Sequence, residues 1–317
     1  MQTKATAQEF RVITSRFSFA LVSLGILIGS QLRAHAADPV AELASFSVFN
    51  NVDLAQLANA DVKPMRGPAM NNARFQSVQT CWVSPGAPAQ VASALRSFNP
   101  ARHSELKVLL HTNGSNFSQL GSLPNNGPVE WLQNATAQKS NELQLSKEEA
   151  AKTAPFAQFW SGVLTARASA GVFGQPPYSN SSNSIRPGDE INSLLSEQPR
   201  IKKQFGGIIG SKGEQYWELL DVDNKGVLTL GSSFNKGMQI ADVLYYASGG
   251  YYAAVTLYQL WPVDVGGKAS TLVWRGDLLS SGELADLHGV ERLGAESALI
   301  KDVAKSVRAF RSDSGSR

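Results

Sequence analysis

Cysteine is almost absent from this sequence of 317 residues, which contains only Cys81. One cysteine cannot form a disulfide within the chain, so an ordinary apolar core must stabilise the fold. Cys81 lies between Thr80 and Trp82 in an apolar, strand-like run, and no catalytic signature surrounds it. This setting is typical of a buried structural thiol, because a cysteine nucleophile needs a histidine partner.

Histidine is scarce as well, and only His103, His111 and His288 follow the first 36 residues. The sequence contains no HExxH pair, no Cys/His spacing of a zinc site and no G-x-S-x-G elbow. The string DVDNKG, residues 221–226, begins like a calcium loop but lacks the acidic residues of its fifth and twelfth positions. We read it as a hairpin turn, and we assign no metal, cofactor or catalytic residue from motifs.

Long apolar runs are missing after the first 36 residues, which read as a targeting segment. Lys4, Arg11 and Arg16 make a basic leader, the apolar run FSFALVSLGILIG follows, and AHA at 34–36 is a small-x-small cleavage pattern. The apolar run is shorter than the roughly 20 residues that span a bilayer. We predict a secretory signal peptide over 1–36, export to the periplasm or the exterior, and no transmembrane segment after cleavage. An uncleaved N-terminal anchor is the alternative.

An excess of charge of either sign is also lacking once the leader is removed. The whole chain has 29 basic and 26 acidic residues, and the leader holds four basic residues and one acidic residue, which leaves 25 of each. The basic character of the full sequence therefore belongs to the leader. It gives no support to nucleic-acid binding.

We expect residues 37–317 to form a single domain that begins with a lead-in over 37–73. Asp53 is placed to cap a short helix there. A strand follows in RFQSVQTCWV and turns sharply at Pro85 and Pro88 into a helix with apolar spacing, and KVLLHT reads as another short strand. Prolines suit such a turn because they cannot donate the hydrogen bonds of a sheet.

Residues 113–210 differ from the rest of the chain in composition and are predicted to be an insertion of helices and polar loops. Ser146 and Glu149 form a capping-box pattern that predicts the start of a helix. Pro155 should bend this helix or start a new one. DEINSLLSEQ is a second amphipathic helical segment. Because the loops are rich in Asn, Ser, Gly and Pro, we expect the insertion to be peripheral. Proteolysis should then begin near Asn125 or within residues 179–184.

The remaining sequence predicts an antiparallel meander and a long final helix. Strand-like runs from residue 214 to residue 280 are joined by turn signals at DNKG, Gly249-Gly250 and Gly266-Gly267. The final helix shows one apolar stripe made of Val290, Leu293, Ile300, Val303, Val307 and Phe310. We expect this stripe to lie on the sheet face that carries Leu272, Trp274 and Leu278, with Arg275 and Asp277 on the opposite face.

This order of elements resembles the START-like, or helix-grip, superfamily of lipid-transfer and polyketide-cyclase-type domains. Three places carry the resemblance: LANADVKPMRG with the strand–turn–helix after it, GGYYAAVTLYQLWPVDVGGKASTLVWRGDLL near the end of the meander, and LIKDVAKSVRAF in the final helix. The resemblance implies an α+β fold in which an antiparallel sheet wraps around a long C-terminal helix. It also implies an apolar ligand between the sheet and that helix.

By this resemblance the chain is expected to be an exported, non-catalytic binding protein for an apolar or amphipathic small molecule or lipid. The residues expected to line the cavity are Leu257, Gln259, Trp274, Leu278, Val303 and Val307. Two alternatives stay open. One is a hydrolase- or cyclase-type enzyme on the same fold, with His111, Glu218 or Arg275 in acid–base roles, and the other is a structural envelope-associated protein. The sequence favours no particular ligand and no oligomeric state.

Overall fold

The computed structural model describes residues 38–179 and 184–315. The predicted signal peptide, its cleavage site and residues 180–183 lie outside the described residues. The description below concerns the unit formed by residues 37–317.

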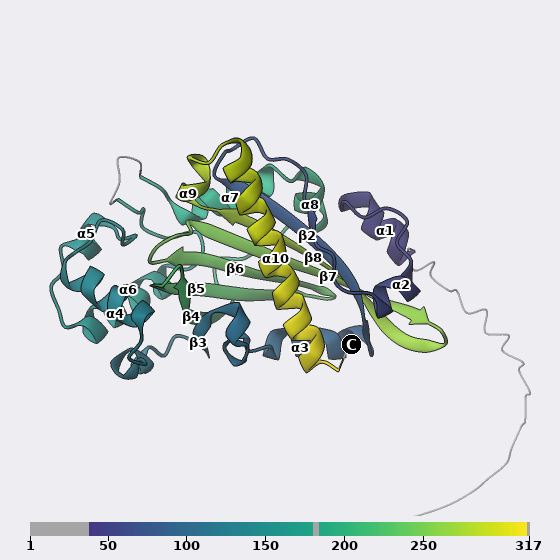
Figure 1. Ribbon diagram of the computed structural model, residues 1–317, viewed down its shortest axis with the longest axis horizontal. Coiled ribbons are helices and arrows are strands. Elements are labelled where there is room, and N and C mark those ends of the chain that lie inside the picture. Colours follow the sequence, from purple (N-terminus) through teal and green to yellow (C-terminus); the bar gives the residue numbers. More distant parts are fainter. Residues whose placement is uncertain (1–37, 180–183, 316–317) are drawn as a thin grey trace, which may run out of the picture. The chain divides into compact units, whose positions relative to one another are not determined.

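Eight antiparallel strands form one open sheet with the order β1-β2-β8-β7-β6-β5-β4-β3 (Figure 1). Strands β4 to β8 follow one another as a meander, while β2 returns to pair with β8. The strands are β1 (Met65–Arg66), β2 (Phe75–Pro85), β3 (Val108–Asn113), β4 (Glu214–Val222), β5 (Lys225–Lys236), β6 (Gln239–Ala247), β7 (Ala253–Val265) and β8 (Lys268–Ser280).

Helices lie on both sides of this sheet, and the last of them, α10 (Gly289–Asp313), runs across the strands (Figure 1). The other α-helices are α1 (Pro39–Phe46), α2 (Leu54–Asn59), α3 (Pro88–Ser97), α4 (Gly127–Ala137), α5 (Lys147–Ala150), α6 (Phe156–Ala170), α7 (Pro187–Ser196), α8 (Pro199–Gln204) and α9 (Gly282–Ala285). Short 3₁₀ turns are η1 (Pro100–Arg102), η2 (Ser104–Leu106) and η3 (Ser118–Ser122).

Local sequence signals account for several of these boundaries. Strand β2 ends at Pro85, Gly86 adopts a φ of 93°, and α3 begins at Pro88. Asp53 caps α2 through hydrogen bonds from the amides of Ala55 and Gln56, and the capping box of Ser146 and Glu149 starts α5. These predictions are confirmed, because a proline or a short polar side chain occupies each helix start.

The hairpin between β4 and β5 also forms as predicted. Val222 pairs with Lys225, and the two residues between them, Asp223 and Asn224, have φ values of 49° and 62°. A two-residue turn with positive φ at both positions matches the twist of the adjoining strands.

The sheet is covered by apolar layers on both faces. On one face, α3 and α10 pack over β2, β7 and β8 through a cluster that includes Val91, Trp82, Val273, Val303, Val307 and Phe310. On the other face, α1 and the helices α4, α6, α7 and α8 contribute to a larger cluster that includes Phe46, Leu132, Trp160, Ile191, Phe205 and Trp274. The protein is therefore an α+β fold with an antiparallel sheet and a long C-terminal helix, the helix-grip arrangement.

The predicted face for α10 is wrong. Val303 and Val307 pack with Val273, whereas Leu272, Trp274 and Leu278 belong to the cluster on the opposite face. The alternation along β8 pointed the other way, because the face toward α10 carries the charged pair Arg275 and Asp277 and both faces of the strand are nevertheless buried.

The first half of the predicted apolar stripe is also wrong. Val290 and Leu293 are 84% and 50% exposed, while Val303, Val307 and Phe310 are buried. Only the C-terminal half of α10 packs over the sheet in the apolar cluster. The N-terminal half lies beside β1 and the start of β2, where it lines a pocket instead.

The expectation of a peripheral insertion is wrong as well. Trp160, Val163 and Leu164 of α6 and Ile191 and Leu194 of α7 are all fully buried in the larger core cluster. The polar composition of the loops concealed this, because each helix between them carries an apolar face. The described parts of this segment, residues 114–179 and 184–213, therefore supply much of the layer that covers one face of the sheet.

Candidate functional site

The structure does not bring the six predicted cavity residues together. Leu257, Trp274 and Leu278 are fully packed in the larger core cluster, and Val303 and Val307 lie in the cluster under α10. The remaining residue, Gln259, is buried and accepts hydrogen bonds from the side chains of Gln204 in α8 and Gln239. The five apolar side chains thus belong to two cores on opposite faces of the sheet.

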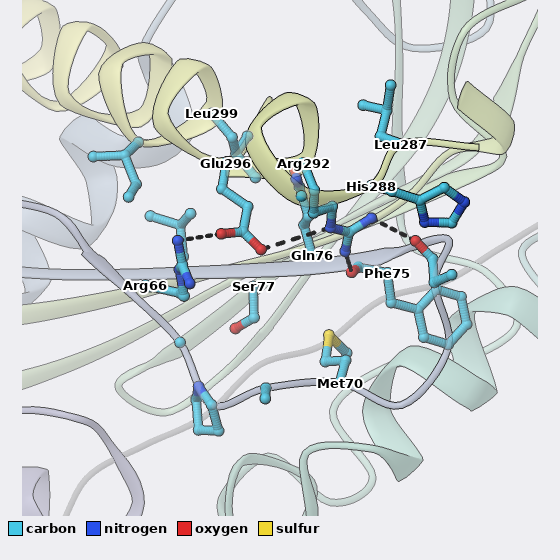
Figure 2. Close-up of a pocket in the computed structure, with 17 residues that line it drawn as sticks. Arg66, Met70, Phe75, Gln76, Ser77, Leu287, His288, Arg292, Glu296 and Leu299 are labelled. Atoms are coloured by element: carbon cyan, nitrogen blue, oxygen red, sulfur yellow. Dashed lines mark hydrogen bonds and ion pairs between the residues drawn. The ribbon is translucent and has the colours of Figure 1, made fainter. Parts of the chain in front are cut away.

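A pocket of about 340 Å³ instead lies between α10 and the edge of the sheet (Figure 2). It exists because β1 is only two residues long: Met65 and Arg66 pair with Gln79 and Val78, and the chain then leaves the edge. Pro68 follows soon after and cannot donate a ladder hydrogen bond. The outer edge of β2 at Phe75 and Gln76, before its pairing with β1, is therefore left for α10 to cover.

Arg292 of α10 connects the helix to the edge of the sheet through hydrogen bonds. Its guanidinium donates to the backbone carbonyl of Phe75 at the sheet edge, to that of Ala73 in the preceding loop, and to that of Leu284 over 3.0 Å. Three backbone carbonyls thus share one half-buried cation. The arrangement fixes the first turns of α10 against the edge of β2.

The pocket lining is amphipathic. Its apolar side is made by Met70, Phe75, Val78, Leu287, Leu299 and Ile300. On its polar side Glu296 is ion-paired with Arg66, and its other oxygen lies 3.6 Å from Nε of Arg292. Figure 2 shows these three charged side chains in a line between α10 and β2. One carboxylate between two guanidinium groups leaves an excess of one positive charge.

A second hollow, of about 520 Å³, lies at the other end of α10. Its charged residues already pair with one another, since Nε and Nη2 of Arg308 donate to the two carboxylate oxygens of Asp61 over 2.8 Å and 2.7 Å. The same hollow is walled by Asn59, Ala60 and Ser312. Its wide, exposed form and its satisfied ion pair make it the weaker candidate.

A polar cluster also lies on the α10 face of the sheet. Its first members are His111 in β3 and Glu218 in β4, which are register partners, with Nδ1 of His111 2.8 Å from Oε1 of Glu218. Beside them the ring of Tyr216 lies across β5 at Gly231, where an added Cβ would come within 2.0 Å of the ring. The glycine therefore makes room for the tyrosine.

Asp242 of β6 continues this cluster across the sheet. It pairs with Ser233 on one side and with Thr256 on the other, and Thr256 in turn pairs with Asp277. Burial raises the pKa of Asp242 to about 6, against a smaller lowering by a hydrogen bond from Ser233 and by the charge of Arg275. A carboxyl group with this pKa can both give and take a proton near neutral pH.

Arg275 and Asp277 of β8 complete the cluster. Nε and Nη2 of Arg275 donate to the carboxylate of Asp277 over distances of 2.7 to 3.0 Å. Burial alone would lower the pKa of Arg275, but the charges of Asp277, Tyr258 and Asp242 and the hydrogen bonds to Asp277 together outweigh it and raise the pKa. The guanidinium also lies 5.6 Å from the ring centre of Tyr258, whose own pKa is raised by burial.

Of the three residues named for acid–base roles, the structure brings His111 and Glu218 into contact and places Arg275 farther along the same face. Sequence reasoning missed Asp242, although a lone acidic residue in the apolar strand QIADVLYYA could have revealed it. It also missed the pocket residues Gln76 and Arg292. No pattern in the sequence showed that these two would meet.

Within residues 38–179 and 184–315, no group of three or more His, Cys, Asp or Glu side chains is arranged to hold a metal ion. The helices in those same ranges include none with the length and apolar character needed to cross a bilayer.

Comparison with known proteins returned no matching family model and no matching curated protein. Among solved structures, the chain is similar to a START superfamily protein from Mycobacterium smegmatis, with 15% identity and a TM-score of 0.22 over 31% of this chain. It spans 65% of the length of that protein. It is also similar to Ara h 8.0201, with 9% identity and a TM-score of 0.24, over 42% of this chain and 92% of the other.

Proposed function

We propose that this protein binds one small apolar or amphipathic molecule in the pocket between α10 and the edge of β2. The observation that carries the proposal is the pocket itself: about 340 Å³, lined by apolar side chains together with Arg66, Arg292 and Glu296. Small-molecule sites typically measure about 300–1,000 Å³ and combine an apolar lining with a few polar groups. The volume suits a single ring system or one short chain.

Fluorescence of the neutral probe N-phenyl-1-naphthylamine tests this binding. Wild-type protein should enhance the emission with a stoichiometry of one. Leu299→Trp, which fills the pocket, should abolish the enhancement. Leu293→Trp is the matched control, because Leu293 lies on the same helix but is 50% exposed and outside the lining. Equal binding by all three proteins would place the probe elsewhere.

We also propose that the protein is exported. The support is the sequence alone: a basic leader, an apolar run and the AHA pattern at 34–36. N-terminal sequencing of protein recovered from the periplasm or the medium should begin Ala37-Asp38-Pro39. A retained Met1 in a membrane fraction would show an uncleaved anchor.

A second candidate function, proton-transfer catalysis, is favoured by the contact between His111 and Glu218 and by the raised pKa of Asp242. A carboxylate base beside phenol donors is suited to moving a proton at a carbon next to a carbonyl group. The test is deuterium exchange into simple ketones in heavy water, followed by mass spectrometry. Exchange that is catalysed by wild type and lost in Asp242→Asn would support catalysis, and no exchange above the buffer rate would oppose it.

A further inference from the structure

Three side chains that line the pocket beside α10 have a buried atom without a hydrogen bond among the described residues: Gln76, Ser77 and Glu296, of which Glu296 is ion-paired with Arg66. Nε2 of Gln76 and Oγ of Ser77 make no hydrogen bond there, although the two residues are only 5% and 7% exposed. Both line the pocket, but as neighbours on β2 they point to opposite faces of the strand. Gln76 is on the face toward α10, and Figure 2 shows Ser77 pointing to the side of β2 away from Glu296 and Arg292. Buried donors without acceptors are uncommon in folded proteins because desolvating them is unfavourable.

The type of donor limits what can bind to it. The amide nitrogen of Gln76 can only donate. A partner must therefore present at least one acceptor oxygen toward β2. Hydrogen bonds to ionised acceptors are about twice as strong as those to neutral ones, so an anionic oxygen is the best match.

The charges around this donor favour the same partner. Arg66 and Arg292 together outweigh Glu296 by one positive charge. The first turn of α10 also lines the pocket, and its N-cap residue, His288, makes no side-chain capping hydrogen bond. The positive end of the dipole of a 25-residue helix therefore faces the same region.

Apolar side chains lie next to these charges, and the space is small. Leu299 and Ile300 follow Arg292 and Glu296 along α10 and line the same volume of about 340 Å³. This volume lies near the lower end of the range of ligand sites, so a lipid with two acyl chains does not fit. One short chain or one ring system does.

We infer that the ligand of this pocket is a small amphipathic anion, whose carboxylate or phosphate oxygen accepts a hydrogen bond from Gln76 while its apolar part contacts Leu299 and Ile300. The inference rests on the proposed binding function and specifies the chemical class of the ligand. Both head groups offer the same anionic acceptor, so the experiment compares them.

Isothermal titration of the purified protein with octanoate, octyl phosphate and 1-octanol tests this inference. We expect at least one of the two anions to bind at least tenfold more tightly than the alcohol, and the tighter of the two identifies the head group. Gln76→Leu should weaken binding of that anion about tenfold and leave octanol unchanged. Because it removes an unpaired buried donor, the same variant should melt at or above the wild-type temperature. The control Gln56→Leu makes the same change at an exposed position of α2 and should alter neither affinity.

The outcomes distinguish a failure of this inference from a failure of the proposed binding function on which it rests. Equal affinities for octanol and both anions would overturn the anionic head group and leave the binding function standing. Binding of N-phenyl-1-naphthylamine with no binding of either anion would also overturn the anionic head group and leave the binding function standing. If neither the probe nor any octyl compound binds, both proposals fall. An anion that binds equally well to Gln76→Leu and wild type would refute the assigned donor.

Discussion

Nη1 of Arg275 in β8 donates a hydrogen bond to Oγ of Ser306 in α10 over 3.0 Å. The contact shows which face of the sheet the long helix covers. It also places a charged group under the helix, where an apolar contact is more usual. Arg275 is tolerated there because Asp277 pairs with it through three hydrogen bonds.

Removal of one member of that pair should be costly. Asp277→Ala leaves the guanidinium of Arg275 only 13% exposed and without its carboxylate. We expect a loss of about 2–3 kcal/mol in the free energy of unfolding, somewhat below the cost for a fully buried pair. Chemical denaturation measures it. The double variant Arg275→Met/Asp277→Leu should recover most of the loss, and a double variant no more stable than the single one would contradict this account.

The packing of α10 can be tested at Val307, which is 1% exposed and contacts the cluster around Trp82 and Val273. Val307→Asp places an unpaired carboxylate in that layer and should destabilise the protein by several kcal/mol, on the order of its whole stability. Lys305→Asp on the exposed face of the same helix should change stability by less than about 1 kcal/mol. Equal melting temperatures for Val307→Asp and wild type would refute the buried half of the helix.

Asp242 gives the stability a defined dependence on pH. Its folded-state pKa of about 6 exceeds the ordinary value of 3.8, so the folded protein binds this proton more tightly than the unfolded chain does. The contribution is therefore present below about pH 4 and is lost as the pH rises through about 6. Asp242→Asn should remove this dependence and stabilise the protein at pH 7.5 by on the order of 1–2 kcal/mol, allowing for solvent screening at a half-buried site.

Urea denaturation of wild type and Asp242→Asn between pH 4 and pH 8 provides the measurement. The difference in stability between the two proteins should grow with pH across this interval. A constant difference would show that the carboxyl group titrates normally.

The insertion should behave as part of the core. Arg167 of α6 is completely buried, and its Nε and Nη2 donate to the carboxylate of Glu149 over 2.8 Å and 2.6 Å. Glu149→Ala leaves this cation unpaired and should cost about 3–5 kcal/mol. Glu130→Ala, an exposed position of α4, is the control and should melt close to wild type. If Glu149→Ala lowers the melting temperature no more than the control does, this buried ion pair does not stabilise the protein as proposed.

The sequence predicted the elements of this fold better than their packing. Turn residues are local signals, so the strand–turn–helix at Pro85 and Pro88, the hairpin at Asp223 and the start of α5 at Ser146 could be read directly. The face of β8 that meets α10 could not, because it carries the charged pair Arg275 and Asp277 and alternation therefore pointed to the opposite face. The missed helix α4 begins within the polar string NNGP, which resembles a loop.

The site was harder to predict because it depends on contacts between distant parts of the chain. Arg292 meets Phe75 across 217 positions of sequence, and Gln76 lines the pocket only because β1 ends at Arg66. His111 and Glu218 could be named from the strand assignments, but their contact follows from the register of β3 and β4. Register of this kind is fixed by tertiary packing and not by local sequence.

The most direct test of the proposed binding function is thiol labelling of the pocket. Burial raises the pKa of Cys81 to about 12, so the native thiol should react slowly and leave a low background. Met70→Cys places a reactive thiol in the pocket wall, and Met238→Cys places one at a position that is 41% exposed and outside it. Saturating N-phenyl-1-naphthylamine should slow labelling of Met70→Cys several-fold and leave Met238→Cys unchanged. Labelling of Met70→Cys at the same rate with and without the probe would contradict binding in this pocket.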